Sequence, residues 1–165
     1  MNLFKGCPYG IEEIITNRMV ASVAISPTGA LIPLLDTAAI TGIWANMLYE
    51  IGKYHNVTFT SEECTKIITS CGASILGYLG GSKTLCWLLN FIPGLGTLGA
   101  MAGNVVFNGY YTYAIGMAFH QMLKDYDING KTIWEISKIL INLFVPIPSL
   151  DKLKEIFTVM KNHLT

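Results

Sequence analysis

The sequence FIPGLGTLG, at residues 91–99, lies in a run of 36 positions from Thr84 to Phe119 that contains no charged residue. Pro93 and Gly94 interrupt a helix, because proline lacks a backbone N–H and glycine is a poor helix former. A helix from about Thr97 to Leu123 follows. At ~1.5 Å per residue, its uncharged part is long enough to span a hydrocarbon core of ~30 Å. The sequence therefore predicts a turn between two apolar helices.

We expect these helices to form an apolar hairpin over residues 67–119, in which Lys83 is the only charged residue. Small residues four positions apart let helix backbones approach closely, and Gly99 and Gly103 have this spacing. The hairpin is the best candidate in the chain for insertion into a bilayer. Its turn and helix packing are assigned to Pro93, Gly94, Gly96, Gly99 and Gly103.

The composition lies between those of soluble and membrane-embedded proteins. Of the 165 residues, 13% are charged and 52% are apolar, whereas soluble domains usually have ~25% charged residues. The mean hydropathy is +0.46. These values favour a membrane-associated helical protein. The alternative is a protein that buries unusually much apolar surface in its core, in a partner or in a homo-oligomer.

The charges exclude one class of partner. Eleven basic and eleven acidic residues give a net charge of zero, so nothing indicates the basic stripe that a nucleic-acid-binding protein needs. The cations are nevertheless unevenly placed. Six of the eleven follow the apolar run, namely Lys124, Lys131, Lys138, Lys152, Lys154 and Lys161.

The cysteines and the N-terminal residues bear on the compartment. Cys7, Cys64, Cys71 and Cys86 show no CxxC spacing, which indicates small buried side chains in a reducing compartment. The first residues, MNLFKGCP, contain no apolar segment of the kind found in signal peptides. We therefore expect the cytoplasm, or the cytoplasmic side of a membrane.

Helical periodicity extends over most of the chain, and no strand-like alternation lasts more than a few residues. We expect an all-α fold of five or six helices around the glycine-rich hairpin. The predicted segments are residues 11–25, a helix that starts at Pro33 and ends near residue 55, and helices beginning near Thr60, Thr97, Thr132 and Leu150. Thr60 with Glu63, and Thr132 with Glu135, have the spacing of capping boxes.

Several motifs resemble catalytic or cofactor-binding sites but are incomplete. GLGTLG at residues 94–99 lacks the preceding strand and the later acidic residue of a dinucleotide site. GYLGGSKT at residues 77–84 resembles a phosphate loop, but Ser82 replaces the glycine before the lysine. His55, His120 and His163 are far apart in the sequence and have no ligand spacing. We expect no enzyme activity, no metal and no cofactor.

Asp36 is the one isolated acid in an otherwise uncharged stretch from Met19 to Tyr49. In lipid, a carboxylate at such a position is costly and therefore functional. The alternative is an acid in the first turn of a helix, which the helix dipole favours and which faces water. Both interpretations stay open at this point.

Residues ~20 to ~122 resemble the uncharacterised helical domain that follows the GTPase domain in many bacterial Era/Ras-like GTPases and related membrane proteins. The resemblance is carried by PLLD at residues 33–36, MLYEIG at residues 47–52, the polar link before Glu62-Glu63, and FIPGLGT at residues 91–97. It implies a helical, membrane-associated domain over residues 1–123, with residues 124–165 as a lysine-bearing amphipathic tail packed on or beside it. Because this chain has no GTP-binding motif, any GTPase would be a separate partner protein.

Two functions follow as hypotheses. In the first, the chain is a non-catalytic, membrane-associated module on the cytoplasmic side, an anchor or adaptor for a separate GTPase or another partner. Its lipid-surface contacts would be Lys138, Lys152, Lys154 and Lys161, since basic amphipathic helices bind anionic lipid. In the second, the chain is a soluble helical module that binds a lipid, a small apolar ligand or a protein partner. A cavity for such a ligand would be lined by Tyr110, Tyr111 and Tyr113.

Overall fold

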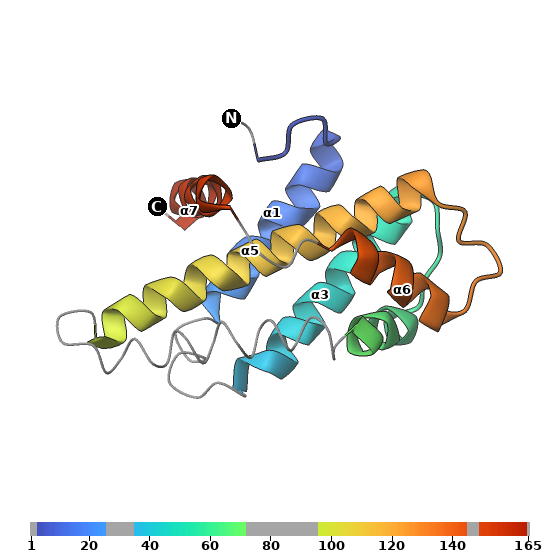
Figure 1. Cartoon of the computed structure of the whole chain (residues 1–165), viewed down its shortest axis with the longest axis horizontal. Helices are drawn as coiled ribbons and strands as arrows, with labels where there is room; N and C mark the ends of the chain where they lie inside the picture. Colours follow the sequence, from blue (N-terminus) through green and yellow to red (C-terminus); the bar gives the residue numbers. More distant parts are fainter. Residues whose placement is uncertain (1–2, 26–34, 72–95, 145–148, 165) are drawn as a thin grey trace.

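The computed structural model describes residues 3–25, 35–71, 96–144 and 149–164 of the chain. Within these ranges the fold is all-α, with six helices and no strand, as the sequence predicts (Figure 1). The helices are α1 (Tyr9–Ala24), α3 (Leu35–Tyr54), a helix over residues 61–71, α5 (Gly96–Asp125), α6 (Ile133–Leu143) and α7 (Leu150–Leu164).

Two of the helices begin at capping boxes, which confirms the sequence prediction. The Oγ1 of Thr60 accepts a hydrogen bond from the backbone N–H of Glu63 at 3.1 Å, and the Glu63 carboxylate accepts one from the Thr60 backbone N–H at 2.7 Å. Thr132 and Glu135 make the same reciprocal pair at the start of α6. These bonds satisfy N–H groups that lack partners inside the helix, and they lower the pKa of both glutamates.

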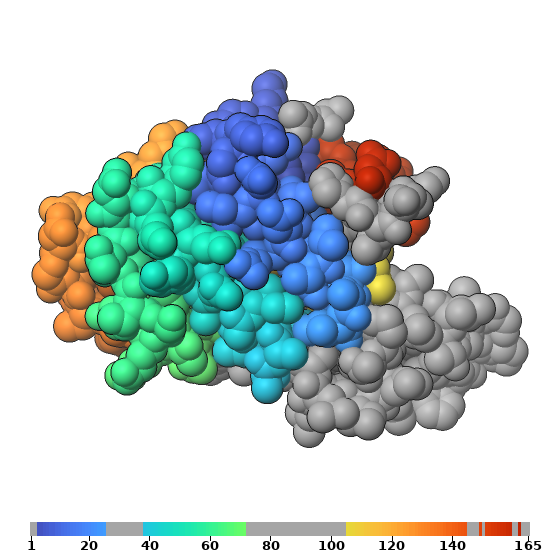
Figure 2. Space-filling view, turned by 180° about the vertical axis from the view of Figure 1, so that it is seen from behind, coloured from blue at the N-terminus to red at the C-terminus, as the bar shows by residue number. Residues whose placement is uncertain are grey.

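The helix α5 is the centre of the fold. It has 30 residues, or about 45 Å of helix, and it contacts α1, α3, α6 and α7. Figure 1 shows it along the length of the molecule, with α6 and α7 at different places beside it. Seen from behind, α1 in blue and α3 in cyan lie side by side over that face (Figure 2). Neighbouring helices bury the side chains of α5 from Asn108 to His120, with only Met117 partly exposed.

Polar contacts fix the rotation of α5 against its neighbours. The indole N–H of Trp44 in α3 donates to Thr112 Oγ1 at 3.0 Å, and both side chains are buried. The Thr112 hydroxyl in turn donates to the Asn108 carbonyl at 2.8 Å. On the outer side, the guanidinium of Arg18 in α1 donates to both carboxylate oxygens of Glu50 in α3. The buried pair sets which face of α5 meets α3 and which face is left for α6 and α7.

The predicted hairpin is described only in part. The helix predicted from about Thr97 to Leu123 is confirmed, because α5 begins at Gly96 and ends two residues beyond Leu123. Pro93 and Gly94 lie outside the described residues, as does most of the first arm. Within residues 3–25, 35–71, 96–144 and 149–164, no helix is both long and apolar enough to cross a bilayer. This includes α5, for which the sequence predicted a spanning length.

Three helices approach one another closely at Gly116 of α5. A Cβ atom built on this glycine would lie 2.7 Å from Ile15 Cγ1 in α1 and 3.1 Å from Met47 Sδ in α3. Both neighbouring side chains are fully buried, so neither can move away freely. The absence of a side chain at position 116 therefore allows α1, α3 and α5 to pack together.

We predict that Gly116→Ala lowers the free energy of unfolding by about 1–3 kcal/mol, because overpacking a filled core outweighs the better helix propensity of alanine. The matched control is Gly42→Ala, at an exposed position of α3 where a Cβ atom meets nothing within 4 Å. That substitution is expected to stabilise the protein by up to about 1 kcal/mol. Urea denaturation followed by circular dichroism measures both. Equal effects of the two substitutions would contradict the packing argument.

Candidate functional site

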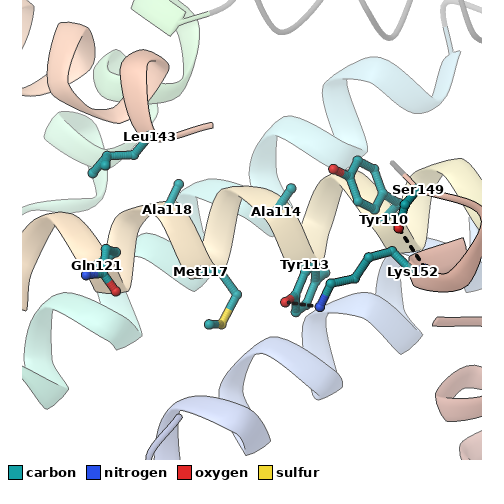
Figure 3. Close-up of a pocket in the computed structure, with 9 residues that line it drawn as sticks. All are labelled: Tyr110, Tyr113, Ala114, Met117, Ala118, Gln121, Leu143, Ser149 and Lys152. Carbon is teal, nitrogen blue, oxygen red and sulfur yellow. Dashed lines mark hydrogen bonds between the residues drawn. The ribbon is translucent and has the colours of Figure 1, made fainter. Parts of the chain in front are cut away.

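One face of α5 forms the floor of a cavity of about 430 Å³. The floor residues have the spacing of a single helix face over three turns, so they extend over about 16 Å. The other described residues of its lining come from the end of α6 and from the start of α7 (Figure 3). The cavity is lined by Tyr110, Tyr113, Ala114, Met117, Ala118, Gln121, Leu143, Ser149 and Lys152.

The cavity lies between the two C-terminal helices. Both α6 and α7 contact α5, and among the described helices they do not pack against each other. Leu143 is the last residue of α6. Ser149 precedes α7, where its hydroxyl accepts a hydrogen bond from the Lys152 backbone N–H at 3.3 Å, as helix-capping serines do. The open space thus follows from where α6 stops and α7 starts.

Lys152 reaches from α7 across one end of the cavity. Its Nζ donates to Tyr113 Oη at 3.1 Å and to the Leu3 carbonyl at 3.5 Å. Tyr113 Oη also donates to the Leu3 carbonyl, at 2.9 Å. The same ammonium lies 5.1 Å from the centre of the Tyr113 ring, a favourable cation–π distance. Three separate parts of the chain, the N-terminal segment, α5 and α7, therefore meet at one lysine.

Polar groups occupy the two ends of the cavity, and its middle is apolar. Figure 3 shows Ser149 and Lys152 at one end and Gln121 with Leu143 at the other. Between them lie Ala114, Met117 and Ala118. Tyr110 is a neutral phenol, because burial and, to a lesser extent, the neighbouring Tyr111 and Tyr113 raise its pKa to about 12. Such an arrangement holds a mainly apolar molecule and orients it by its polar end.

The expected tyrosine lining is correct for two of its three residues. Tyr110 and Tyr113 line the cavity, but Tyr111 does not. The Tyr111 ring instead stacks between those of Phe107 and Phe144, with centroids 6.3 and 6.1 Å away. Adjacent residues of a helix point about 100° apart, so Tyr111 points away from the face that Tyr110 and Tyr113 share at a spacing of three positions.

The four lysines predicted to contact lipid occupy different environments. Lys138 is exposed and its Nζ lies 5.0 Å above the Trp134 ring. Lys154 is exposed, with Asp151 Oδ1 3.8 Å away. Lys152 is partly buried, with a side chain 32% exposed, in the cavity wall rather than on an open surface. Lys161 belongs to α7, but its side chain lies outside the described part of the structure.

For the other predicted site residues, the structure gives at most their position in a helix. Gly96, Gly99 and Gly103 fall in the first turns of α5, and their packing is outside the described residues. Asp36 is the second residue of α3. That position agrees with an acid in a first turn, but the surroundings of its side chain are likewise not described.

The structure reveals a histidine pair that sequence spacing could not show. His55 and His120 are separated by 65 residues, yet His55 Nε2 and His120 Nδ1 are hydrogen-bonded at 2.8 Å. Burial lowers the pKa of both rings, and His55 and Lys124 lower that of His120 further, against an opposing effect of Asp125. One neutral ring therefore donates to the other. Among the described residues, no group of three His, Cys, Asp or Glu side chains could hold a metal ion.

Cys64 and Cys71 are fully buried free thiols, which confirms at these two positions the burial that the sequence predicts for the cysteines. Burial raises the pKa of each to about 11. Because the thiolate is the reactive form, both are protected from oxidation and alkylation in the folded state. Cys7 is partly exposed, and its pKa is raised by burial and by Glu12.

Comparisons of the chain with protein-family models, with curated protein sequences and with solved structures found no match. The resemblance to the GTPase-associated domain stays a prediction that rests on the motifs quoted for it. The case for a function therefore comes from the geometry of the cavity.

We predict that acid destabilises the protein through the histidine pair. The folded-state pKa of each ring lies below the ordinary value of 6.5. The unfolded chain therefore binds more protons as the pH falls below about 6.5, and the free energy of unfolding decreases with it. His55→Gln removes one titrating ring and should make this decrease shallower. Urea unfolding over a pH series measures both slopes, and identical slopes in the two proteins would rule out this origin.

Proposed function

We propose that this chain is a non-catalytic helical binding module that holds a small, mainly apolar molecule in the cavity between α5, α6 and α7. The observation that carries the proposal is the cavity itself. Its volume of about 430 Å³ falls in the range of pockets that bind small molecules, about 300–1,000 Å³. Its apolar middle and convergent polar ends are also typical of such pockets.

The packing around the cavity supports this function. The α5 floor presents small side chains, Ala114 and Ala118, where a ligand would need room. Larger residues at the same positions would fill the space and would make more apolar contacts with α6 and α7. An apolar cavity forfeits the dispersion contacts of its lining, so keeping it open costs stability. A bound apolar molecule restores those contacts.

We predict that the purified chain binds the neutral dye Nile red with one saturable site, and that Ala118→Phe weakens this binding at least tenfold. The phenyl ring would occupy the cavity and would leave the side of α5 that packs against α1 and α3 unchanged. The thermal unfolding temperature should therefore stay equal or rise. Ala39→Phe, at an exposed position of α3, is the matched control and should bind as the wild type does. Fluorescence titration and native mass spectrometry provide the measurements.

Two results would contradict the proposal. One is the absence of saturable Nile red binding in the wild type. The other is unchanged binding in Ala118→Phe when that variant is folded by circular dichroism, since the dye would then be held elsewhere. Native mass spectrometry of the protein as purified adds an independent readout, because a co-purified apolar ligand is expected as a discrete mass increment.

A second candidate function, peripheral association with a membrane surface, is favoured by one exposed feature of α6. Trp134 is 58% exposed, although tryptophan is usually buried, and Lys138 Nζ lies over its ring. Tryptophan and lysine together favour the interface between lipid head groups and water. An anchor or adaptor role on the cytoplasmic side, with a separate GTPase as partner, remains a prediction from the sequence resemblance.

For this candidate we predict binding to vesicles of phosphatidylserine and phosphatidylcholine but only weak binding to phosphatidylcholine alone. Lys138→Glu should reduce the binding severalfold, because each lysine near an anionic surface contributes about 1 kcal/mol. Lys53→Glu is the matched control, since Lys53 also lies over an aromatic ring, that of Tyr49, but on α3. Co-sedimentation measures the binding. Equal loss in both variants would point to net charge rather than to α6.

A further inference from the structure

From the position of Lys152 we infer that the ligand of this cavity is a single-chain amphiphile with a carboxylate head group, which the Lys152 ammonium binds. The inference rests on the proposed binding function and adds the chemical class of the ligand. It depends on three properties of the site: a fixed cation, neutral hydrogen-bond partners around that cation, and an apolar floor of defined length.

The first property is that the cation is held in place before a ligand arrives. Lys152 Nζ already bonds Tyr113 Oη and the Leu3 carbonyl. A free lysine side chain loses rotamer entropy when it is immobilised. Because the protein immobilises this lysine during folding, a ligand that binds it meets a smaller entropic cost.

The second property is the chemistry of its partners. An ammonium has three N–H donors, and within the described residues Lys152 Nζ has two hydrogen-bond acceptors, both of them neutral oxygens. Glu155 Oε2 lies 4.0 Å from Nζ, which is beyond hydrogen-bond distance. The Glu155 carboxylate therefore attracts the Lys152 ammonium electrostatically but accepts no hydrogen bond from it. The third N–H can therefore donate to an anionic oxygen of a ligand in a charge-assisted bond.

The third property is the shape of the space beside the cation. Ala114, Met117 and Ala118 continue from Tyr113 along α5 toward Gln121 and Leu143 (Figure 3). A small anion would leave this floor uncovered, and an uncharged chain would offer Lys152 Nζ no carboxylate nearer than that of Glu155, at 4.0 Å. A linear molecule with one acidic end and an apolar chain meets both requirements. One ammonium matches the single charge of a carboxylate better than the double charge of a phosphate monoester.

The test compares decanoate with decanol, which share the apolar chain and differ in the head group, by displacement of Nile red. In the wild type we expect decanoate to bind about tenfold more tightly than decanol, as expected for one charge-assisted bond. Lys152→Met keeps an apolar stem but removes the charge, and should abolish the preference, because decanoate loses the charge-assisted bond and decanol never makes it. Lys154→Met, which removes an exposed lysine from the same helix, should bind both molecules as the wild type does.

If Lys152→Met does not fold, a second variant still tests the role of Lys152. Glu155→Gln removes the nearby carboxylate while the bonds of Lys152 to Tyr113 and Leu3 stay in place. The preference for decanoate over decanol should then increase, by several fold, because the competing negative charge is gone. A preference that stays constant or decreases in Glu155→Gln would contradict the role given to Lys152.

The outcomes separate this inference from the proposed function. Equal affinities for decanoate and decanol in the wild type, or a preference that survives Lys152→Met, would overturn the carboxylate head group and leave the binding function intact. Much tighter binding of decyl phosphate than of decanoate would also overturn the carboxylate assignment. The binding function itself would be overturned if neither molecule displaces Nile red and Ala118→Phe binds Nile red as tightly as the wild type does.

Discussion

The close packing of α1 and α3 against α5 at Gly116 is the constraint on which the rest of the structure depends. Ile15 and Met47 occupy the space where a side chain at this position would lie. Because α1 and α3 both reach α5 here, the buried length of α5 is covered from one side by two helices that also contact each other. The remaining surface of α5 is left to α6 and α7; α7 also contacts α1, but α6 and α7 have no mutual contact within the described residues.

The hydrogen bond between Trp44 and Thr112 converts this packing into a defined orientation of α5. A buried donor and acceptor must remain paired, so α5 cannot rotate about its axis without losing the bond. Tyr113, the next residue, is thereby directed away from α3 and toward Leu3 and Lys152. The cavity floor is the continuation of that face. The site on one side of α5 is therefore positioned by contacts on the other.

Local signals in the sequence predicted the helices well, whereas contacts between distant residues could not be predicted from spacing. The capping boxes at Thr60 and Thr132 and the start of α5 near Thr97 agree with the structure, because each depends on residues within a few positions. The lack of charge in α5 was ambiguous, since core helices and spanning helices both exclude charge. A segment without charged residues is not necessarily apolar. In α5, Asn104, Asn108 and three tyrosines lower the mean hydropathy. Lys152 is 39 residues from Tyr113, and His55 is 65 from His120, so only the fold brings these pairs together.

The position of the cavity links ligand binding to the attachment of the C-terminal helices. The helix α7 is tied to α5 through Lys152 and Tyr113, and α6 ends at Leu143 on the far side of the same space. A molecule in the cavity would contact all three helices and would thus add the contact that α6 and α7 do not make with each other. Anything that binds only the folded arrangement stabilises it in proportion to the logarithm of its concentration. A ligand therefore acts here as part of the packing, and a carboxylate at Lys152 would strengthen the junction that already joins α7 to the centre of the fold.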